Sequence, residues 1–440
     1  MKNWKVILFG AGQAGICLLE RIKNHVVCIA DNDAEKQGGK LLGKPIISPA
    51  QIADFEFDVI VIASIWENEI RDQLLKMGYG DKIISHLVSD STILKENAQA
   101  ANYFSDLNKP LLRNMHLNLT SACNLKCRIC RPPNDKSNPR SLTKKMIEGI
   151  VDDSFDDLTH LMLDSSGELT LSPHLEYVLK EAKKRKLSIS ISSNGTMIDE
   201  KLAELFVASN VKHIHVSLDS SDKKTNEWIR LGAKHEEILQ GVKNLVAAKI
   251  KFGKIYPQIY FHGAILQQNV HHLKGIVSLA ERIGINGVSF AYCYVHSHMN
   301  PNWSIFFDKQ LCNDKVSEAK EHAKQYGLIF NAPTSFYQHQ KSIPEDKYCQ
   351  YLFNWTYVNP SGEISPCCTA TGYTSGNVKI EKISDIWVNE KYQKLRETYN
   401  TNNPVCNKCA NCYLLAGWDV DDYKVHFHSG HWSEVKKRLE

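Results

Sequence analysis

Three cysteines stand close together in the first third of the chain, in a C-x3-C-x2-C spacing. They lie in the stretch NLTSACNLKCRIC, at Cys123, Cys127 and Cys130. Three thiolates on one loop can hold a [4Fe–4S] cluster, whose four irons each need a ligand. Three protein ligands leave one iron open to a small molecule. The alternative is a closed structural zinc site, which needs a fourth ligand such as His116 or a cysteine of the C-terminal third.

A second group of cysteines occupies the C-terminal third. Two halves of a ligand set, separated by an insert that carries a helix, are typical of a small metal-binding module, and zinc would satisfy the same spacing. Nine of the thirteen cysteines fall in the two groups, which favours metal ligation over random use in a core. The second group comprises Cys349, Cys367, Cys368, Cys406, Cys409 and Cys412.

A glycine-rich turn near the N-terminus indicates a phosphate or nucleotide site. The β-rich run Lys5–Phe9 enters GAGQAG, a helical pattern follows, and the strand-like run Val26–Ala30 ends on Asp31. Glycines allow a tight turn and a close backbone approach, the helix N-terminus suits a phosphate, and the acid suits a ribose hydroxyl. A docking domain with an empty crevice is the alternative. The candidate residues are Gly10, Gly12, Gly15 and Asp31.

The elements between the two cysteine groups alternate between strand and helix. This alternation favours a parallel sheet with right-handed crossovers, curled into a partial barrel with active groups at the C-terminal ends of its strands. After a first short strand at Met115–Leu119, strand-like runs occur at His160–Leu163, Ser188–Ser192, His213–Leu218, Gln258–Leu266 and Gly287–Val295. Helical patterns occur near Leu175–Lys184, Asp199–Ala208, Glu236–Ala248 and Val270–Ile283.

The amino-acid composition argues against nucleic-acid-binding and membrane proteins. The 440 residues carry 53 basic and 49 acidic side chains without a long run of one sign, so we expect no nucleic-acid partner. No apolar run approaches the length of a membrane span, and the chain begins without a basic-then-apolar leader. We therefore expect a cytoplasmic protein without a membrane partner.

The cysteine loop and the motifs behind it resemble the signature of the radical SAM enzymes. The resemblance implies that the open iron binds S-adenosylmethionine and that one electron cleaves this cofactor to a 5′-deoxyadenosyl radical. A flavodoxin- or ferredoxin-like donor would supply the electron. One departure is Ile129, where the family usually has an aromatic residue. The cofactor-binding residues implied by the resemblance are Gly167, Glu168, Ser192, Asn194, Ser217, Asp219 and Arg230.

The C-terminal cysteines resemble the SPASM domain of the same enzymes, which holds one or two auxiliary [4Fe–4S] clusters. The chain has C-x2-C-x2-C where the two-cluster version has a longer four-cysteine string. The resemblance therefore implies one auxiliary cluster on Cys349, Cys367, Cys406 and Cys409, with Cys368 and Cys412 able to replace a neighbour. Beyond Gly417 the tail carries His426, His428 and His431, and we expect a solvated terminal segment.

Residues 1–97 resemble the small Rossmann modules attached to bacterial sugar-modifying enzymes. That resemblance implies NAD or a nucleotide sugar at the glycine turn and points to a nucleotide-activated sugar as substrate. Cys293, in FAYCYVH, is either a small buried hydrophobe or a hydrogen-atom donor of the kind that radical epimerases use.

The sequence thus predicts an α/β radical SAM enzyme of the oxidoreductase or epimerase type, acting on a polar metabolite. The alternative enzyme is a SPASM-type maturase of a ribosomal peptide, and the alternative of another class is a zinc-stabilised nucleotide-sensing protein. The predicted parts are a Rossmann-like domain (1–97), a linker (98–112), a partial (β/α)6 TIM-like barrel (113–335), a SPASM domain (345–415) and a tail (416–440).

Overall fold

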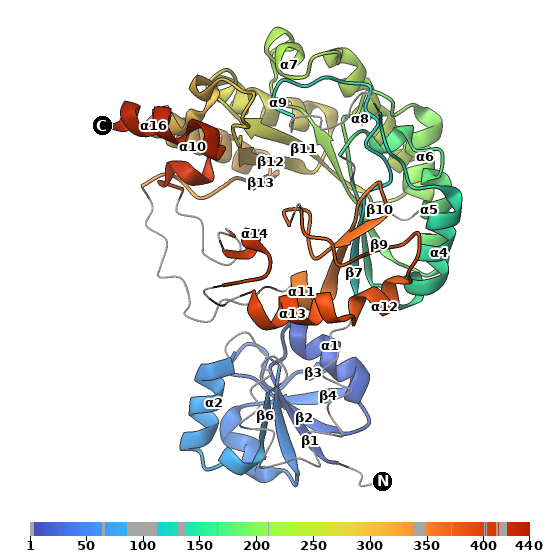
Figure 1. The fold of residues 1–440 in the computed structure, drawn as a ribbon, viewed down its shortest axis with the longest axis vertical. Helices are drawn as coiled ribbons and strands as arrows, with labels where there is room; N and C mark the ends of the chain where they lie inside the picture. Colours follow the sequence, from blue (N-terminus) through green and yellow to red (C-terminus); the bar gives the residue numbers. More distant parts are fainter. Residues whose placement is uncertain are drawn as a thin grey trace. The chain divides into compact units, whose positions relative to one another are not determined.

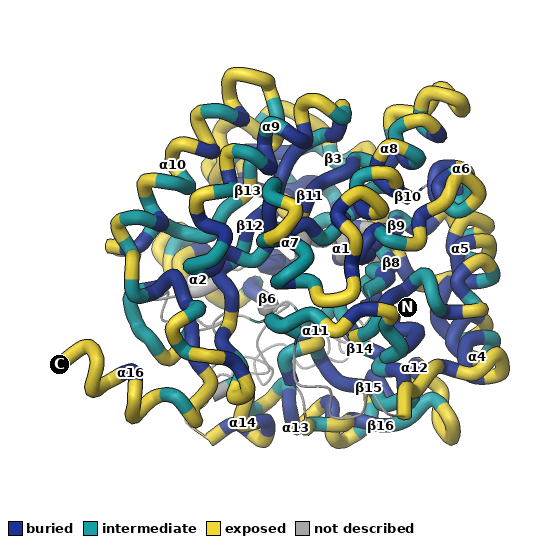
Figure 2. The backbone as a smooth tube through the Cα atoms, turned by 90° about the horizontal axis from the view of Figure 1, so that it is seen from above, coloured by how far each residue is buried: buried dark blue, intermediate teal, exposed yellow. Residues whose placement is uncertain are grey.

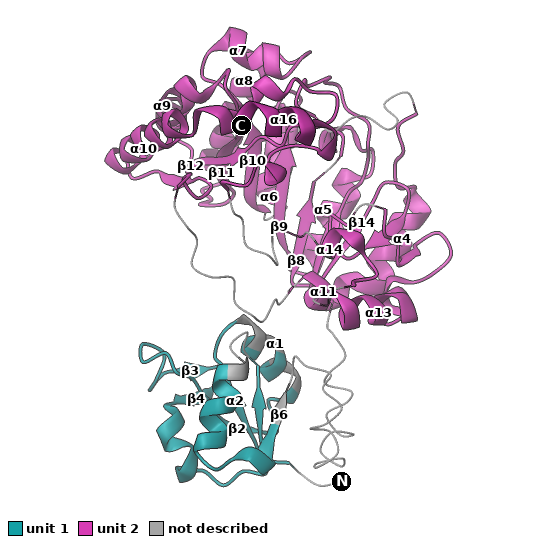
Figure 3. Cartoon of the chain, turned by 60° about the vertical axis from the view of Figure 1, so that its left-hand side comes forward, with its two compact units in different colours: residues 1–111 teal, residues 112–440 magenta. Residues whose placement is uncertain are grey.

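The chain folds into two compact units, residues 1–111 and 112–440 (Figure 3). The predicted linker falls almost entirely outside the described residues. A computed structural model describes residues 4–63, 67–85, 112–130, 138–164, 166–209, 211–337, 351–370, 372–399, 403–410 and 420–440, together with Cys349, Thr401 and Cys412.

The first unit is built on a sheet in the order β3–β4–β2–β1–β5–β6. All neighbours are parallel except β3, which is antiparallel to β4. Runs such as VILF and VIVI are apolar throughout, because alternate residues enter separate cores on the two faces of the sheet. The strands are β1 (Val6–Phe9), β2 (Val26–Ala30), β3 (Lys40–Leu41), β4 (Lys44–Ile47), β5 (Val59–Ile62) and β6 (Ile83–Ser85), and the helices are α1 (Gln13–Ile22), η1 (Pro49–Asp54), α2 (Glu67–Lys76) and η2 (Gly80–Lys82).

The second unit is built on a ten-stranded sheet in the order β13–β12–β11–β10–β9–β8–β7–β14–β15–β16 (Figure 1). Neighbouring strands from β13 through β7 to β14 are all parallel, which confirms the expected curled parallel sheet. The strands are β7 (Asn114–Leu117), β8 (His160–Leu163), β9 (Ser188–Ser193), β10 (Val211–Ser217), β11 (Gln258–Ile265), β12 (Gly287–Tyr292), β13 (Ile329–Asn331), β14 (Trp355–Val358), β15 (Glu363–Ser365) and β16 (Gly376–Asn377).

Helices cover the outer face of this sheet (Figure 1). Several begin at a side-chain cap: Thr143, Asp199 and Asp222 each accept a hydrogen bond from a backbone amide of the first turn. The crossover helices are α4 (Lys144–Ser154), α5 (Leu175–Lys184), α6 (Glu200–Ala208), α7 (Lys223–Ile229), α8 (His235–Lys251), α9 (Leu273–Ile283) and α10 (Lys309–Gln325), with short 3-10 turns η4 (Phe155–Asp157), η5 (Leu169–Leu171), η6 (Val270–His272), η7 (Pro301–Trp303) and η8 (Ile305–Asp308).

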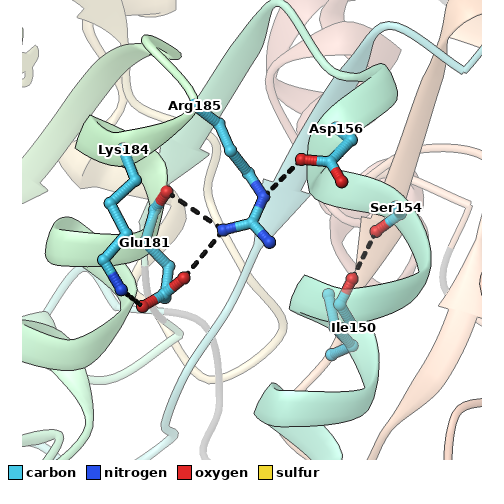
Figure 4. Close-up of polar contacts among 6 residues, drawn as sticks. All are labelled: Ile150, Ser154, Asp156, Glu181, Lys184 and Arg185. Atoms are coloured by element: carbon cyan, nitrogen blue, oxygen red, sulfur yellow. Dashed lines mark hydrogen bonds and ion pairs between the residues drawn. The ribbon is translucent and has the colours of Figure 1, made fainter.

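Polar contacts tie neighbouring helices together at the bottom of the barrel (Figure 4). Arg185, just after α5, donates to Glu181 at 2.7 Å and to Asp156 of η4 at 2.6 Å. The hydroxyl of Ser154 donates to the Ile150 carbonyl at 2.7 Å and closes the end of α4. The Arg185–Asp156 ion pair is exposed and orients the helices more than it stabilises the fold, whereas the Ser154–Ile150 hydrogen bond is buried.

The C-terminal module continues the barrel sheet. Strand β14 is parallel to β7, and β15 and β16 follow as antiparallel neighbours. The module therefore extends the edge of the barrel sheet. Its helices are α11 (Tyr351–Asn354), α12 (Ile383–Trp387), α13 (Glu390–Thr398) and α14 (Asn407–Ala410).

The expectation of a solvated tail is wrong for residues 420–427, whereas most side chains from His428 onward are exposed. Phe427 bridges to Val295 beyond β12, and the backbone amide of Val295 donates to the His426 carbonyl at 2.8 Å. His426 is buried, and its ring lies among aromatic rings that include Tyr292 and Phe306. This part of the tail packs against the second unit because the aromatic side chains bury apolar area. The histidines that the sequence shows in this segment did not indicate such packing. It contains η9 (Tyr423–Val425), η10 (Ser429–His431) and α16 (Trp432–Leu439).

Among the described residues, no helix combines the length and the apolar character that crossing a membrane requires.

Candidate active site

The other predicted motifs of the second unit contact the cysteine loop that follows β7. Gly167 donates its amide to the Thr120 carbonyl at 3.3 Å, and Glu168 donates to the Ala122 carbonyl at 2.6 Å. A Cβ at Gly167 would lie 1.9 Å from the Ala122 carbonyl oxygen. This position therefore requires glycine for steric reasons, independent of any contact with a cofactor.

Glu168 is a buried carboxylate surrounded by donors. Ser193 Oγ donates to its Oε1 at 2.7 Å, Thr170 Oγ1 donates to Oε1 at 2.9 Å, and the Asn194 amide donates to Oε2 at 2.7 Å. In the part of the chain that the structure describes, no ion pair joins Glu168 to a basic side chain. Such a site suits a cationic group from a ligand, because a buried charge favours an opposite charge.

Asn194 contacts the loop through its side chain. Its Nδ2 donates to Asn124 Oδ1 at 2.8 Å, and Asn124 Nδ2 donates in turn to Thr196 Oγ1 at 2.9 Å. Thr196 returns a hydrogen bond to Asn194 Oδ1 at 2.8 Å. This ring of polar contacts joins the turn after β9 to the second residue of the CNLKC core.

Cys127 lies opposite Arg230. The amides of Lys126 and Arg128 donate to the carbonyls of Leu231 and Ile229, both at 2.8 Å, so the loop pairs with the segment that ends α7. Cys127 and Arg230 are the central residues of the two paired segments. The arginine predicted to meet a cofactor carboxylate is therefore held beside the middle cysteine.

Arg230 also forms an ion pair with Asp219. Arg230 Nε lies 2.7 Å from Asp219 Oδ2, and the Asp219 carboxylate is fully buried. Asp219 Oδ1 accepts the amide of Ala264 at 2.8 Å. This geometry makes Asp219 a support for the guanidinium, whose terminal nitrogens are left to bind a carboxylate.

Ser192 and Ser217 lie near the C-terminal ends of β9 and β10, while Cys293 follows β12. Cys293 is buried, and burial raises the pKa of its thiol to about 12. The sulfur therefore stays protonated near neutral pH. Its thiol contacts the Tyr294 carbonyl at 3.7 Å, a distance that sulfur hydrogen bonds reach.

The chemistry of the loop cysteines fits an iron–sulfur cluster. Cys123 and Cys127 pack against the main core, and burial raises the pKa of Cys127 to about 11. A thiol in this environment becomes a thiolate when a metal centre replaces its proton. Within the described ranges, no three His, Cys, Asp or Glu side chains converge as they would around a single metal ion.

The C-terminal cysteines gather in a separate apolar cluster. That cluster includes the buried Leu352, Leu395 and Tyr399. Cys368 is exposed and is not part of the cluster. The structure thus favours Cys412 over Cys368 as the spare cysteine that could replace a ligand. The cysteines packed there are Cys349, Cys367, Cys406, Cys409 and Cys412.

The glycine turn of the first unit has the backbone that the motif requires. A Cβ at Gly15 would lie 1.8 Å from the Gly10 carbonyl oxygen, whereas a Cβ at Gly12 would meet nothing within 4 Å. Asp31 Oδ2 accepts the amide of Ala11 at 2.6 Å, and Oδ1 accepts the amide of Asp33. The carboxylate predicted to meet a ribose hydroxyl therefore already holds the turn together.

Several residues of the site were not predicted from the sequence. Asn118 Oδ1 accepts the amide of Ser166 at 3.2 Å, and its Nδ2 donates to the Tyr357 hydroxyl at 2.9 Å. Asn118 and Asn124 both stand inside the quoted cysteine stretch, and asparagines in an otherwise apolar run were the available signal. The alternate histidines His213 and His215 of β10, and His262 of β11, were also not predicted, although period two is itself a strand signal.

Comparison with known families identifies the class. Residues 117–279 match the radical SAM superfamily, and residues 349–413 match the iron–sulfur cluster-binding SPASM domain. The chain therefore carries a radical SAM domain and a SPASM domain, with S-adenosylmethionine, a catalytic [4Fe–4S] cluster and an auxiliary [4Fe–4S] cluster as their cofactors. Residues 2–84 match the C2185-like N-terminal family, so the Rossmann-like sugar-modification type is not confirmed for the first unit.

Curated relatives are distant. The chain is 22% identical to the tungsten-containing aldehyde ferredoxin oxidoreductase cofactor-modifying protein of Pyrococcus furiosus, over 70% of this chain and 89% of that protein. It is 23% identical to the PqqA peptide cyclase of Granulibacter bethesdensis, over 66% and 78%. With the mycofactocin maturase MftC of Mycobacterium ulcerans it shares 26% identity over 38% of this chain and 43% of that protein.

Among solved structures, SuiB of Streptococcus suis bound to its precursor peptide SuiA has a similar fold. The TM-score is 0.55 at 17% identity, over 83% of this chain and 88% of that chain. This likeness supports the radical SAM fold with a SPASM domain.

Proposed function

We propose that this protein is a radical SAM enzyme that modifies a peptide by abstracting a hydrogen atom from carbon. The observation that carries the proposal is the union of two cysteine sites in one unit. The likeness to relatives named as a mycofactocin maturase and a PqqA peptide cyclase supports it. These relatives support the predicted alternative better than a nucleotide-sugar substrate.

When bound, the catalytic cluster and S-adenosylmethionine supply a 5′-deoxyadenosyl radical. Glu168 offers its carboxylate to the cofactor amine, and Arg230 offers its guanidinium to the cofactor carboxylate. Asp219 orients that guanidinium through the 2.7 Å ion pair. Gly167 and Asn194 hold the cysteine loop in place by backbone and side-chain contacts.

Cys293 is the candidate for returning a hydrogen atom to a substrate radical. Because burial keeps the sulfur protonated, an S–H bond is available for this transfer. The thiyl radical that remains then takes one electron and one proton, for which the auxiliary cluster is the candidate electron source. If Cys293 does not act, the substrate radical would lose a proton and pass one electron to the auxiliary cluster held by the C-terminal cysteines, which gives an oxidised product.

A nucleotide-activated sugar is the second candidate substrate. The tight Gly10–Gly15 approach and the placement of Asp31 favour it, because they resemble a phosphate-binding turn. On this alternative, NAD or the nucleotide of the substrate binds the first unit.

The test begins with anaerobic reconstitution of the full chain with iron and sulfide. The enzyme then receives S-adenosylmethionine, dithionite and either random-sequence peptides or a mixture of UDP-, GDP- and CMP-sugars. We expect the peptides to raise 5′-deoxyadenosine formation. Stimulation by the sugars alone would overturn the peptide proposal in favour of the sugar substrate.

Two cysteine variants control this test. Cys127→Ala should abolish 5′-deoxyadenosine formation, whereas Cys312→Ala, which changes a buried cysteine of α10, should keep it.

In D2O, a hydrogen return from Cys293 would place one deuterium at the attacked carbon. Cys293→Ala should then prevent this labelling while 5′-deoxyadenosine still forms.

A further inference from the structure

The six strands β7 to β12 present one face to the helices and the opposite face to the interior of the curled sheet, here called the lumen face (Figure 1). On the helix side, Leu161, Ile191 and Val216 are fully or almost fully buried in the main core. On the lumen face, many residues are partly exposed, which gives the alternating burial of β8, β9 and β10 (Figure 2). Solvent therefore reaches the lumen face.

The lumen face is polar and, along the strands, uncharged. Barrel interiors of this type are normally filled by branched apolar side chains. Here the strand register places histidines and serines side by side, and none of these lumen-face strand residues is acidic, lysine or arginine. The set linked by register is Asn114, His116, His160, Met162, Ser188, Ser190, Ser192, His213, His215, Ser217, Gln258, Tyr260, His262, Ala264, Gly287, Ser289 and Ala291.

His262 is the most open polar group of this wall. It is exposed although it lies in a central strand whose next residues, Phe261 and Gly263, are buried. Its register neighbours are Ser217 and Ser289. His215 lies beside it with ring centroids 6.1 Å apart and stacks on the Tyr260 ring at 5.2 Å. Imidazole and hydroxyl groups are thus gathered at the level where the strands approach the cysteine loop.

The imidazoles of the lumen face are neutral near physiological pH. Burial lowers the pKa of His215 to about 4 and lowers the pKa of His262, His160 and His213 as well. The protein around the His262 ring disfavours its charged form, although part of the side chain is open to solvent in the lumen. Charged groups face it from the rim: Asp164 after β8, and the Asp219–Arg230 pair.

We propose that this wall, centred on His262 with His215 and Ser289, selects a substrate group that is uncharged but rich in hydroxyl or amide hydrogen bonds. The inference rests on the proposed function and adds the chemical class of the group that is attacked. In a peptide, that class is Ser, Thr, Asn or Gln. In a sugar it is the hydroxylated ring.

Energetics decide between the possible groups. A charged side chain would lose its hydration and find no opposite charge along the strands. An apolar side chain would leave neutral imidazoles and hydroxyls without hydrogen bonds, which costs more than the missing contacts alone. Leaving one such group unsatisfied costs about 1–3 kcal/mol, so the site should reject an analogue that lacks the polar group by about tenfold or more.

The test uses the reconstituted full chain and four pools of short synthetic peptides with random flanks. The central residue is Ser, Thr, Asn or Gln in the first pool, aliphatic or Phe in the second, acidic in the third and basic in the fourth. A fifth arm contains UDP-sugars. The readout is 5′-deoxyadenosine formation, divided by the rate of the same enzyme without substrate.

We expect the first pool to exceed the other three peptide pools by about tenfold. His262→Phe should shift the preference toward the apolar pool, and His262→Gln should retain the wild-type order. His271→Phe, at an exposed histidine of η6 outside the lumen, serves as the matched control and should also retain it.

The inference is overturned if a charged or apolar pool is preferred by the wild type, if no arm raises the rate, or if His262→Phe leaves the order unchanged. Stimulation by UDP-sugars alone would refute the peptide proposal. That outcome would still support an uncharged polar selection, provided that His262→Phe abolishes the stimulation and His262→Gln keeps it.

Discussion

Substitution of Gly167 by alanine would test whether the site is assembled around the cysteine loop. The added Cβ would lie 1.9 Å from the Ala122 oxygen and 2.5 Å from the carbonyl carbons of Ala122 and Ser121. Relief requires a separation of about 1 Å between two backbone segments, since no flexible side chain can move aside. Ala122 immediately precedes the first ligand cysteine, so that cysteine must move with it.

The expected loss of unfolding free energy follows from the contacts that would be strained. Overpacking of a tight site costs about 1–3 kcal/mol. The two hydrogen bonds across this contact, from Gly167 to Thr120 and from Glu168 to Ala122, contribute about 1 kcal/mol each. We therefore expect the free energy of unfolding to fall by about 3–5 kcal/mol if both bonds are lost. A shift of about 1 Å in a ligand would reduce turnover by about a hundredfold.

The assay measures denaturant unfolding, iron per chain and 5′-deoxyadenosine formation for Gly167→Ala. Gly149→Ala is the matched control, because Gly149 lies within α4 and a Cβ there meets nothing within 4 Å. Alanine at that helical position should raise stability by about 0.5–1 kcal/mol. Wild-type stability, iron content and turnover in Gly167→Ala would refute the close approach on which this reasoning depends.

Three further predictions concern other parts of the second unit. Arg230→Lys and Asp219→Asn should each raise KM for S-adenosylmethionine about tenfold. A lysine lacks the planar guanidinium that binds a carboxylate through two N–H groups, and an asparagine lacks the negative charge that orients Arg230. Unchanged KM in both variants would contradict the carboxylate-binding role. Cys406→Ala should lower auxiliary iron, while Cys368→Ala, at an exposed cysteine, should keep it, as iron and sulfide analysis will show. Burial lowers the pKa of His426 to about 4, so the unfolded chain binds more protons below about pH 6.5 and stability falls as the pH drops from there toward 4. In His426→Phe this part of the pH dependence of urea unfolding should disappear, whereas in the control His428→Phe it should persist.

Most of the barrel could be predicted from sequence because its signals are local. The strand β8 and the helix α5 have the bounds that the patterns predicted, since apolar periodicity and Gly or polar breaks mark both ends. The parallel pairing of β14 with β7 could not be predicted, because it joins residues about 240 positions apart and no local pattern encodes it. The packed tail was missed for the same reason, since its partners are Val295 and the rings around it.

The site shows a similar division. Cysteine spacing singled out the two sets of candidate ligands, because ligand geometry imposes sequence spacing, and five of the six C-terminal cysteines pack in one apolar cluster. It did not predict their supports: Asn124 with Asn194, or the pairing of Cys127 with the Arg230 segment, arises only when separate strand ends meet. The surroundings of the Asp219 and Glu168 carboxylates also differ, which the order of the motifs in the sequence could not show. One carboxylate holds a guanidinium, and the other is held by uncharged donors.

The sheet itself joins the two cysteine sites. Strand β14 pairs with β7, and beyond it the amide of Asn118 donates to the Val358 carbonyl at 3.0 Å. Asn118 opens the catalytic loop, while Cys349 and Cys367 lie on either side of the β14–β15 hairpin. Because a hydrogen-bonded sheet resists sliding by less than a full register step, the separation between the cysteine loop and the β14–β15 hairpin is set by strand pairing. The proposed exchange of an electron with the auxiliary cluster therefore needs no movement of this hairpin relative to the cysteine loop.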